Sequence, residues 1–187
     1  MNLALGVSFD EVKHEYWYKG KQLSGITALV AKKLGLKYSN AFVGEHAEEG
    51  IHIHKAVQKW INTGELESVH PGVLWIIETL KEARHLRFEK HNFFSETLVS
   101  DLKQYASAVD IIGINPAWVK GSLDIYDIKK GKFNREYVTW QLSVYKYFID
   151  KYTDFDVNDC YCLAVKDREV YKIFPKKRED VEKLLYD

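Results

Sequence analysis

The sequence predicts an α/β fold in which a mixed central β-sheet is flanked by helices, with a hairpin and helices at its N-terminal end. Two observations support this prediction. Helical periodicity dominates residues 41–90, whereas three strand-like segments follow one another closely over residues 93–129. A further helix and two further strands come next. This order of elements is typical of an α/β sandwich with a mixed sheet, not of a doubly wound parallel sheet.

The first segments predict a hairpin followed by a short helix. Short strands are expected at residues 7–10 and 14–18, where aromatic and β-branched residues gather, and residues 19–21 are expected to form a tight, glycine-containing turn before Gln22-Leu23. The helix is expected over residues 28–34, with Ser24 and Thr27 as candidate N-terminal caps.

Two longer helices are expected before the strands begin. The first covers about residues 41–61 and is stopped by the polar, glycine-containing segment 62–64. Its apolar residues recur at helical spacing and form one face, which consists of Phe42, Ile53, Val57, Trp60 and Ile61. The second helix follows Pro71 and covers roughly residues 72–90.

The remaining segments predict the sheet and the helices that cover it. Strands over residues 93–99, 105–114 and 118–129 are joined by short turns, one of them at Asn115-Pro116, and are expected to form an antiparallel meander. The later elements are expected to be a helix over about 135–151, strands over 160–165 and 170–174, and a helix that begins near Lys177. All 187 residues are expected to form one domain, with the hairpin and helices over about 1–90 and the sheet core over about 92–175.

Composition limits the class of protein. The chain has no apolar run near 18 residues and no leader with a charged start and a long apolar segment, so we expect neither membrane insertion nor export. Cys160 and Cys162 are expected on opposite faces of one strand without a disulfide, which favours the cytoplasm. The 27 basic and 27 acidic side chains cancel, so any contact with nucleic acid must come from local basic clusters.

Two aspartates and a lysine are the candidate catalytic residues. Asp110 lies in a nearly apolar strand segment, where an ionised carboxylate needs a cation or a hydrogen-bond donor. Asp127 and Lys129 are two residues apart on the next expected strand and so share a face, which Asp124 does not. If the strands are neighbours, Asp110, Asp127 and the carbonyl oxygen of Ile128 can bind one hard cation such as Mg²⁺.

This pattern also has simpler explanations. An Asp-x-Lys pair on a strand is commonly an exposed ion pair that adds little stability. His52 and His54 form a His-x-His pair that would suit a metal site on a strand, but on the expected helix the two rings point apart. An unrelated metalloenzyme built on these two histidines therefore stays open as a weaker alternative.

The motifs and their order resemble the PD-(D/E)XK nuclease superfamily, in particular its RecB-like and phage-encoded exonuclease branch. Asp110 resembles the first motif acid, with Val109 in place of the proline, and residues 127–131 resemble the D-x-K-x-G motif. Residues 50–54 resemble the helical G-x-x-x-H motif that ends at the metal-binding histidine, and residues 141–145 resemble the Q-L-x-x-Y motif. The resemblance covers about residues 7–150.

The resemblance implies a restriction-endonuclease-like core and a metal-dependent deoxyribonuclease, with an exonuclease of recombination, replication or repair as the first choice. It adds His54 to the ligands of a Mg²⁺ or Mn²⁺ ion, gives Glu96 a supporting role, and assigns Gln141 and Tyr145 to substrate contact or to steadying Lys129. The basic residues around the second motif are expected to grip DNA phosphates, and they are Lys120, Lys130, Lys132 and Arg135. Two cysteines cannot supply the four ligands of an iron–sulfur cluster, so none is expected.

Several alternatives stay open for these residues. His54 can be a hydrogen-bonded histidine at the core edge, Gln141 and Tyr145 can simply pack, and Glu96 can lie on a solvated strand edge. The whole chain can also be an inactive nuclease-fold module that binds nucleic acid or a protein. The sequence does not determine whether ends or internal bonds are cut, the polarity of cleavage, the choice between DNA and RNA, or the number of ions. It also leaves open a homo-oligomer or an assembly with a recombination or replication protein. A phage-encoded protein would act in the host cytoplasm.

Overall fold

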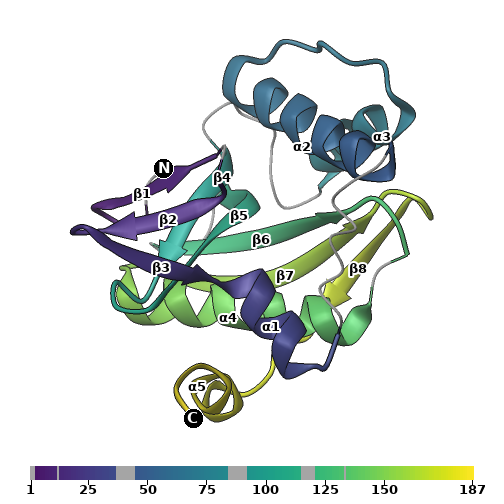
Figure 1. Ribbon diagram of the computed structural model, residues 1–187. Coiled ribbons are helices and arrows are strands. Elements are labelled where there is room, and N and C mark those ends of the chain that lie inside the picture. Colours follow the sequence, from purple (N-terminus) through teal and green to yellow (C-terminus); the bar gives the residue numbers. More distant parts are fainter. Residues whose placement is uncertain (1–2, 12, 37–44, 84–91, 115–120, 133) are drawn as a thin grey trace.

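The computed structural model confirms an α/β architecture with a mixed, open central sheet flanked by helices (Figure 1). It describes residues 3–11, 13–36, 45–83, 92–114, 121–132 and 134–187. The strands are β1 (Val7–Asp10), β2 (Glu15–Tyr18), β3 (Lys21–Gly25), β4 (Phe93–Ser100), β5 (Tyr105–Ile114), β6 (Ser122–Lys129), β7 (Asp156–Ala164) and β8 (Glu169–Ile173). The helices are α1 (Ile26–Lys33), α2 (Glu45–Thr63), α3 (Pro71–Glu82), α4 (Arg135–Tyr152) and α5 (Arg178–Tyr186).

The sheet runs in the order β1-β2-β3-β5-β6-β7-β8, and β4 pairs with β5 outside this path. The predicted meander is confirmed, because β4 pairs antiparallel with β5 and β5 pairs antiparallel with β6. Strand β7 pairs parallel with β6, which the crossover connection through α4 allows, and β8 pairs antiparallel with β7. The sheet is therefore mixed, as predicted.

The N-terminal segment differs from the prediction in two places. Residues 21–25 form a third strand, where only a hairpin was expected, because Lys21 to Leu23 pair back onto β2. Helix α1 begins at Ile26, two residues earlier than predicted, since Gly25 in extended backbone serves as its N-cap without a side-chain bond. Ser24 and Thr27 are therefore not caps. The apolar residues Ile26 and Val30 draw α1 onto the sheet.

The later boundaries shift by a few residues. Helix α3 ends at Glu82, and the rest of its predicted span, 84–90, lies outside the described residues, as do residues 41–44 of the second predicted helix and residues 118–120 of the third predicted strand. Strand β7 begins at Asp156, four residues before the prediction, because Asp156 and Val157 already pair with the start of β6. Among the described residues, these shifts move no candidate site residue to a different element.

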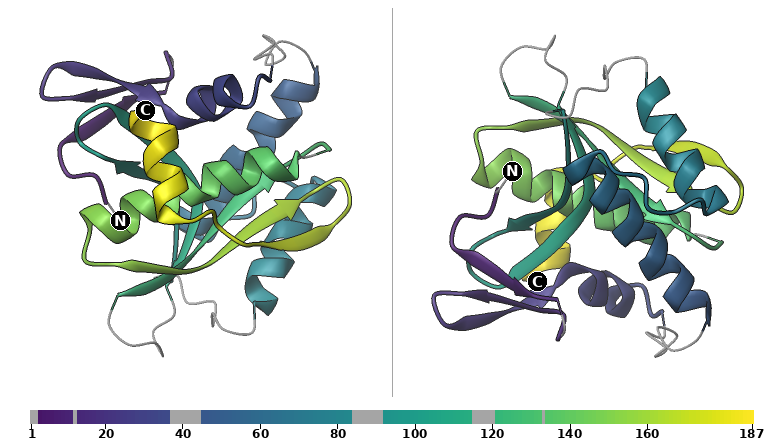
Figure 2. Two further views of the ribbon diagram at one scale, coloured as in Figure 1. Left: turned by 90° about the horizontal axis from the view of Figure 1, so that it is seen from below. Right: turned by 90° about the horizontal axis from the view of Figure 1, so that it is seen from above.

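The helices cover the two faces of the sheet as separate layers. Helices α1, α4 and α5 lie on one face, where α4 is the central helix, and α2 and α3 lie on the other, as the two opposite views in Figure 2 show. Both cysteines are free and both belong to the α4-side core, so the expectation of opposite faces is wrong. The reason is simple: residues two apart on a strand share a face.

One edge of strand β5 pairs with two different strands, and the place where these two strands separate is called the fork of β5 below. Near its start, Tyr105 and Ala106 pair with β3, and near its end, residues 111–114 pair with β6. Residues 107–110 lie between these two contacts. Because β3 leads directly into α1 and β6 diverges after Tyr126, this short stretch of β5 faces the space between two separating strands, and Asp110 is one of its residues.

Candidate functional site

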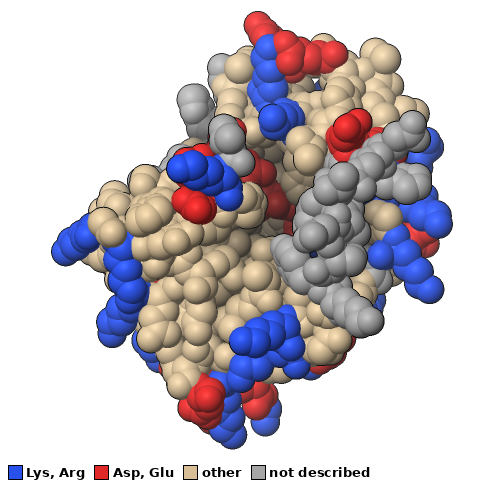
Figure 3. Space-filling model, in the orientation of Figure 1, with Lys and Arg blue, Asp and Glu red and all other residues tan. Residues whose placement is uncertain are grey.

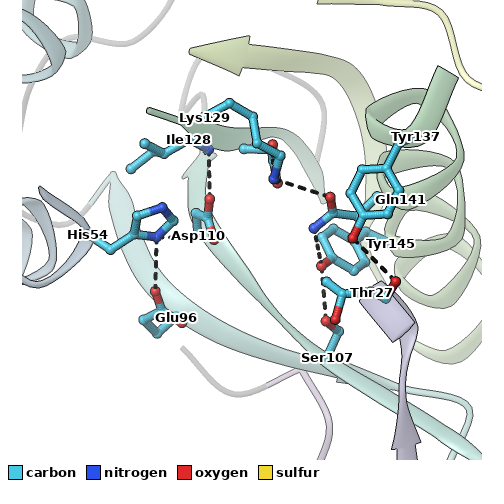
Figure 4. A network of polar contacts seen from close by, with 11 residues as sticks. Thr27, His54, Glu96, Ser107, Asp110, Ile128, Lys129, Tyr137, Gln141 and Tyr145 are labelled. Carbon is cyan, nitrogen blue, oxygen red and sulfur yellow. Dashed lines mark hydrogen bonds and ion pairs between the residues drawn. The ribbon is translucent and has the colours of Figure 1, made fainter. Parts of the chain in front are cut away.

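Three metal-ligating side chains meet at the fork of β5. His54 Nδ1 lies 3.6 Å from Asp110 Oδ1 and 4.0 Å from Glu96 Oε1. One ligand atom from each residue lies within 4.8 Å of the others, which is a spacing that a single ion can bridge. The three side chains are partly buried and come from α2, β4 and β5, so the group forms only when the sheet and α2 are assembled (Figure 4).

An unusual backbone conformation places Glu96 in this group. Glu96 has φ 47°, in the left-handed region that residues other than glycine rarely adopt. The β4–β5 register runs continuously on both sides, from Ser95 opposite Ile111 to Thr97 opposite Val109, with Glu96 across from Asp110. Strand β4 is continuous through this point, but its ladder of paired residues skips Glu96 and Asp110. Such strain is retained where surrounding structure fixes it, and it is common at functional sites.

The backbone of β6 binds Asp110 directly. The Ile128 N–H donates to Asp110 Oδ2 at 2.6 Å. Since the neighbouring Lys129 carbonyl accepts from Val165 on the opposite edge, Ile128 directs both its N–H and its carbonyl toward β5. The carbonyl oxygen of Ile128 therefore lies on the edge where the sequence predicted a ligand.

Asp127 and Lys129 share the face that points toward α4, as strand parity predicted. Lys129 Nζ donates to Asp127 Oδ1 at 2.8 Å and to Gln141 Oε1 of α4 at 3.3 Å. The Asp127 side chain is only 2% exposed, whereas that of Lys129 is 26% exposed. Asp127 Oδ2 lies 2.7 Å from the same ammonium but receives no directed hydrogen bond among the described residues. This pair is not the exposed ion pair of the simpler explanation.

Helix α4 supports Lys129 through a buried chain of polar groups. Gln141 Nε2 donates to the Tyr145 hydroxyl at 2.8 Å, and the Tyr145 and Ser107 hydroxyls lie 2.9 Å apart. All three side chains are buried. Gln141 and Tyr145 thus steady Lys129, which was one of their two predicted roles. Ser107 was missed by sequence reasoning, although it lies three residues before Asp110 on the same strand.

The close approach of these charges shifts their pKa values. Burial opposes protonation of His54, but the carboxylates of Asp110 and Glu96 outweigh it and raise the pKa of His54 to about 9. Burial raises the pKa of Asp110, against the opposing effect of His54, and it raises the pKa of Asp127 to about 6 despite Lys129. Burial alone would lower the pKa of Lys129, but Asp127 and Asp110 raise it above its ordinary value.

The residues at the fork fit a hard divalent cation. Two carboxylates, an imidazole and a backbone carbonyl are oxygen-rich ligands of the kind that Mg²⁺ and Mn²⁺ accept. Burial raises the pKa values of Asp110 and Asp127, so their ionised forms are unfavourable here, and a bound cation would stabilise them. The group that brings its ligand atoms together contains Glu96 but not Asp127, which is engaged with Lys129. The predicted ligand Asp127 therefore lies outside this group, and Glu96, which was predicted only to support the site, lies inside it as a candidate ligand.

Two further assignments concern the histidine pair and Asp124. His52 and His54 both lie in α2, yet His52 Nε2 bonds the Ser68 hydroxyl at 2.8 Å while His54 faces Asp110. The two rings therefore serve different places, which removes the His-x-His alternative. Asp124 is buried on β6 and accepts from the Asp159 N–H at 3.0 Å, so it is a structural acid apart from the site, as predicted.

The basic residues predicted to grip DNA have different surroundings. Lys130 forms an ion pair with Glu49 of α2, and Glu49 also bonds His70 at the start of α3. Lys130 thereby ties the end of β6 to the helical layer. Lys132 and Arg135 are exposed, and the Arg135 guanidinium lies 5.6 Å from the ring centre of Tyr171. Lys120 lies outside the described residues.

The surface above the site is hollowed. Figure 3 shows a depression between the lobe of the N-terminal hairpin and the lobe of α2 and α3, with acidic side chains at its floor.

Within the parts of the chain that the structure describes, none of the helices combines the length and the apolar character needed to cross a bilayer. No family model matches the chain, and neither curated proteins nor solved structures give a match.

Proposed function

We propose that this protein is a metal-dependent nuclease that hydrolyses DNA phosphodiester bonds. One observation carries the proposal: His54, Glu96 and Asp110, which could hold a metal ion, lie beside an ion pair between the buried Asp127 and the partly exposed Lys129, and Ile128 lies between the two groups. Cleavage of a phosphodiester needs both a cation and a positioned positive charge near the nucleophile. The fork of β5 supplies groups for each.

The side chains divide the work as follows. A bound Mg²⁺ or Mn²⁺ would lower the pKa of a water molecule and polarise the phosphate. His54, Glu96, Asp110 and the Ile128 carbonyl would hold the ion. Lys129, fixed by Asp127 and Gln141, presents its ammonium at the partly open side of the site, where it orients the attacking water and offsets the charge that develops on phosphate oxygens. Because the ammonium is already held in place, little rearrangement of the protein is needed as charge develops in the transition state.

The fold supports a finer proposal. The β4–β5–β6 meander, followed by α4 and by β7 parallel to β6, is consistent with a restriction-endonuclease-like core, and the motifs lie on the elements that the PD-(D/E)XK resemblance requires. We therefore propose a phage-type exonuclease of recombination, replication or repair that acts in the cytoplasm. Lys132 and Arg135, both exposed near the N-terminus of α4, are the residues proposed to contact backbone phosphates.

A cleavage assay with matched variants tests the proposal. The purified protein is incubated with end-labelled linear, circular and single-stranded DNA, with Mg²⁺, with Mn²⁺ and with EDTA. We expect cleavage only with metal, and its complete loss in Asp127→Asn. Asp124→Asn is the control, because it alters a second buried acid of β6 that faces the opposite side of the sheet. Thermal unfolding confirms that both variants are folded.

The outcomes separate the alternatives. Undiminished cleavage by Asp127→Asn would refute the site. If the wild type bound metal but cleaved none of the DNA substrates, with or without metal, the result would instead favour the inactive module that binds nucleic acid or protein. The substrate that disappears first shows whether ends or internal bonds are cut.

A further inference from the structure

We propose that Ser107 is a positioning residue for Lys129, acting through Tyr145 and Gln141 over a one-way chain of buried hydrogen bonds. This inference rests on the proposed function only for its effect on cleavage. The chain itself is a property of the folded protein. It begins at the ammonium of Lys129 on β6, crosses to two residues of α4 and returns to β5 at Ser107 (Figure 4).

Lys129 sets the direction of the chain. A lysine ammonium can only donate hydrogen bonds, so Gln141 must turn its oxygen toward Lys129, as it does at 3.3 Å. The Gln141 nitrogen then faces Tyr145 and donates to its hydroxyl oxygen at 2.8 Å. The proton of the Tyr145 hydroxyl is left for another acceptor. The oxygen of Ser107, at 2.9 Å, is that acceptor.

Because these side chains are buried, the Tyr145 hydroxyl depends on Ser107 as its hydrogen-bond acceptor. The exposed fractions of Ser107, Tyr145 and Gln141 are 4%, 2% and 4%, so water does not readily replace a missing partner. If Ser107 lacks its oxygen, the Tyr145 proton has one other acceptor within the chain, the oxygen of Gln141. To use it, the amide must flip and present its nitrogen to the Lys129 ammonium, which sets two donors against each other. The lysine is then displaced from the place that Asp127 and Gln141 define.

The chain extends beyond the site to the N-terminal hairpin. Burial raises the pKa of Tyr16 to about 12, and a hydrogen bond from Ser107 acts in the opposite direction. Ser107 can therefore accept from Tyr145 and donate to Tyr16 of β2 at the same time. The serine lies in the stretch of β5 between its pairings with β3 and β6.

A double-mutant cycle on thermal stability tests the chain without reference to cleavage. Ser107→Ala is measured alone and with Lys129→Met, which removes the donor that fixes the amide. We expect Ser107→Ala to lower the unfolding temperature by about 2–4 °C in the wild type. The loss should be clearly smaller with Lys129→Met, because the amide is then free to flip. Equal losses in both backgrounds would overturn the inference, since a purely local role adds independently of Lys129.

Kinetics supply the second measurement. On DNA, Ser107→Ala should lower kcat about tenfold with little change in KM, Ser107→Thr should restore most of the loss, and Ser107→Ala should add nothing in a Tyr145→Phe background. Ser143→Ala is the control: Ser143 is a buried serine of α4 that bonds the Thr139 carbonyl and the Lys176 N–H instead of this chain, so kcat should be unchanged. A wild type without nuclease activity would refute the proposed function and leave the stability cycle as the test of the chain. Additive kinetic effects of Ser107→Ala and Tyr145→Phe would refute the inference.

Discussion

The raised pKa of His54 predicts that metal binding depends steeply on pH. In the metal-free protein His54 titrates at about 9, because Asp110 and Glu96 stabilise its protonated form. The nitrogen that binds an ion must first lose its proton. At pH 7, about two units below this pKa, deprotonation costs roughly 2.7 kcal/mol, which weakens the apparent affinity about a hundredfold.

The sign of the effect follows from the direction of the shift. Affinity should rise about tenfold for each unit of pH below about 9 and level off above it, so a change from pH 6.5 to pH 8.0 should tighten binding about 30-fold. Isothermal titration with Mn²⁺ in buffers of different ionisation enthalpy measures both the affinity and the protons released. Close to one proton should leave per ion at pH 7.

Two histidine variants on the same helix make the test specific. His54→Gln removes the titrating group, so the remaining dependence on pH should largely disappear. His52→Gln should leave it intact, because His52 bonds Ser68 and does not face the carboxylates. If the wild type bound Mn²⁺ with equal affinity at pH 6.5 and pH 8.0 and released no proton, His54 would not be a ligand and the reasoning would fail.

Three other predictions concern the acids and the basic surface. Asp110→Asn should abolish cleavage yet raise the unfolding temperature of the metal-free protein at pH 7 by a few degrees, because burial raises the pKa of Asp110 and its ionised form is therefore unfavourable in the fold; a lowered temperature would contradict this. Asp124→Ala should lower the free energy of unfolding by about 1–3 kcal/mol. Its kcat should stay unchanged once the rate is divided by the fraction of folded protein, which thermal unfolding measures. Arg135→Ala should weaken DNA binding and reduce the slope of log K against log salt by about one. Lys130→Ala should change that slope less, since Glu49 already neutralises Lys130, and equal slopes for the two variants would show that this ion pair opens on binding.

The sequence was sufficient for those site residues whose positions follow from periodicity. Alternation along β6 correctly put Asp127 and Lys129 on one face and Asp124 on the other, and helical geometry separated His54 from His52. The same rule was misapplied to Cys160 and Cys162, which share a face. The turn at residues 19–21 was expected, but β3 after it was not assigned as a strand, because its sequence Lys-Gln-Leu-Ser-Gly lacks the aromatic and β-branched residues typical of strands.

Other features depend on tertiary contacts that no local pattern encodes. Glu96 joins His54 and Asp110 because its backbone is left-handed, which strand alternation does not anticipate. The ion pair of Lys130 with Glu49 was not predicted, because it depends on where α2 packs, while the predicted contact of Lys130 with DNA stays a prediction. Ser107 carries no motif at all. Its role becomes visible only when the hydrogen-bond partners of Tyr145 are followed to the end of the chain.

The fork of β5 explains why these groups can coexist in one place. A strand neighbour alongside residues 107–110 would cover Asp110 and Ser107 and would satisfy the backbone with an ordinary ladder. The early departure of β3 and the divergence of β6 leave that edge to side chains from α2 on one face and α4 on the other. Burial of Asp110 and Asp127 raises their pKa values, so their ionised forms are unfavourable in the metal-free protein. A bound ion would remove this unfavourable free energy, and this relief adds to the affinity of the site. At the same metal concentration, the ion should therefore raise the free energy of unfolding more than it would by binding to exposed surface carboxylates.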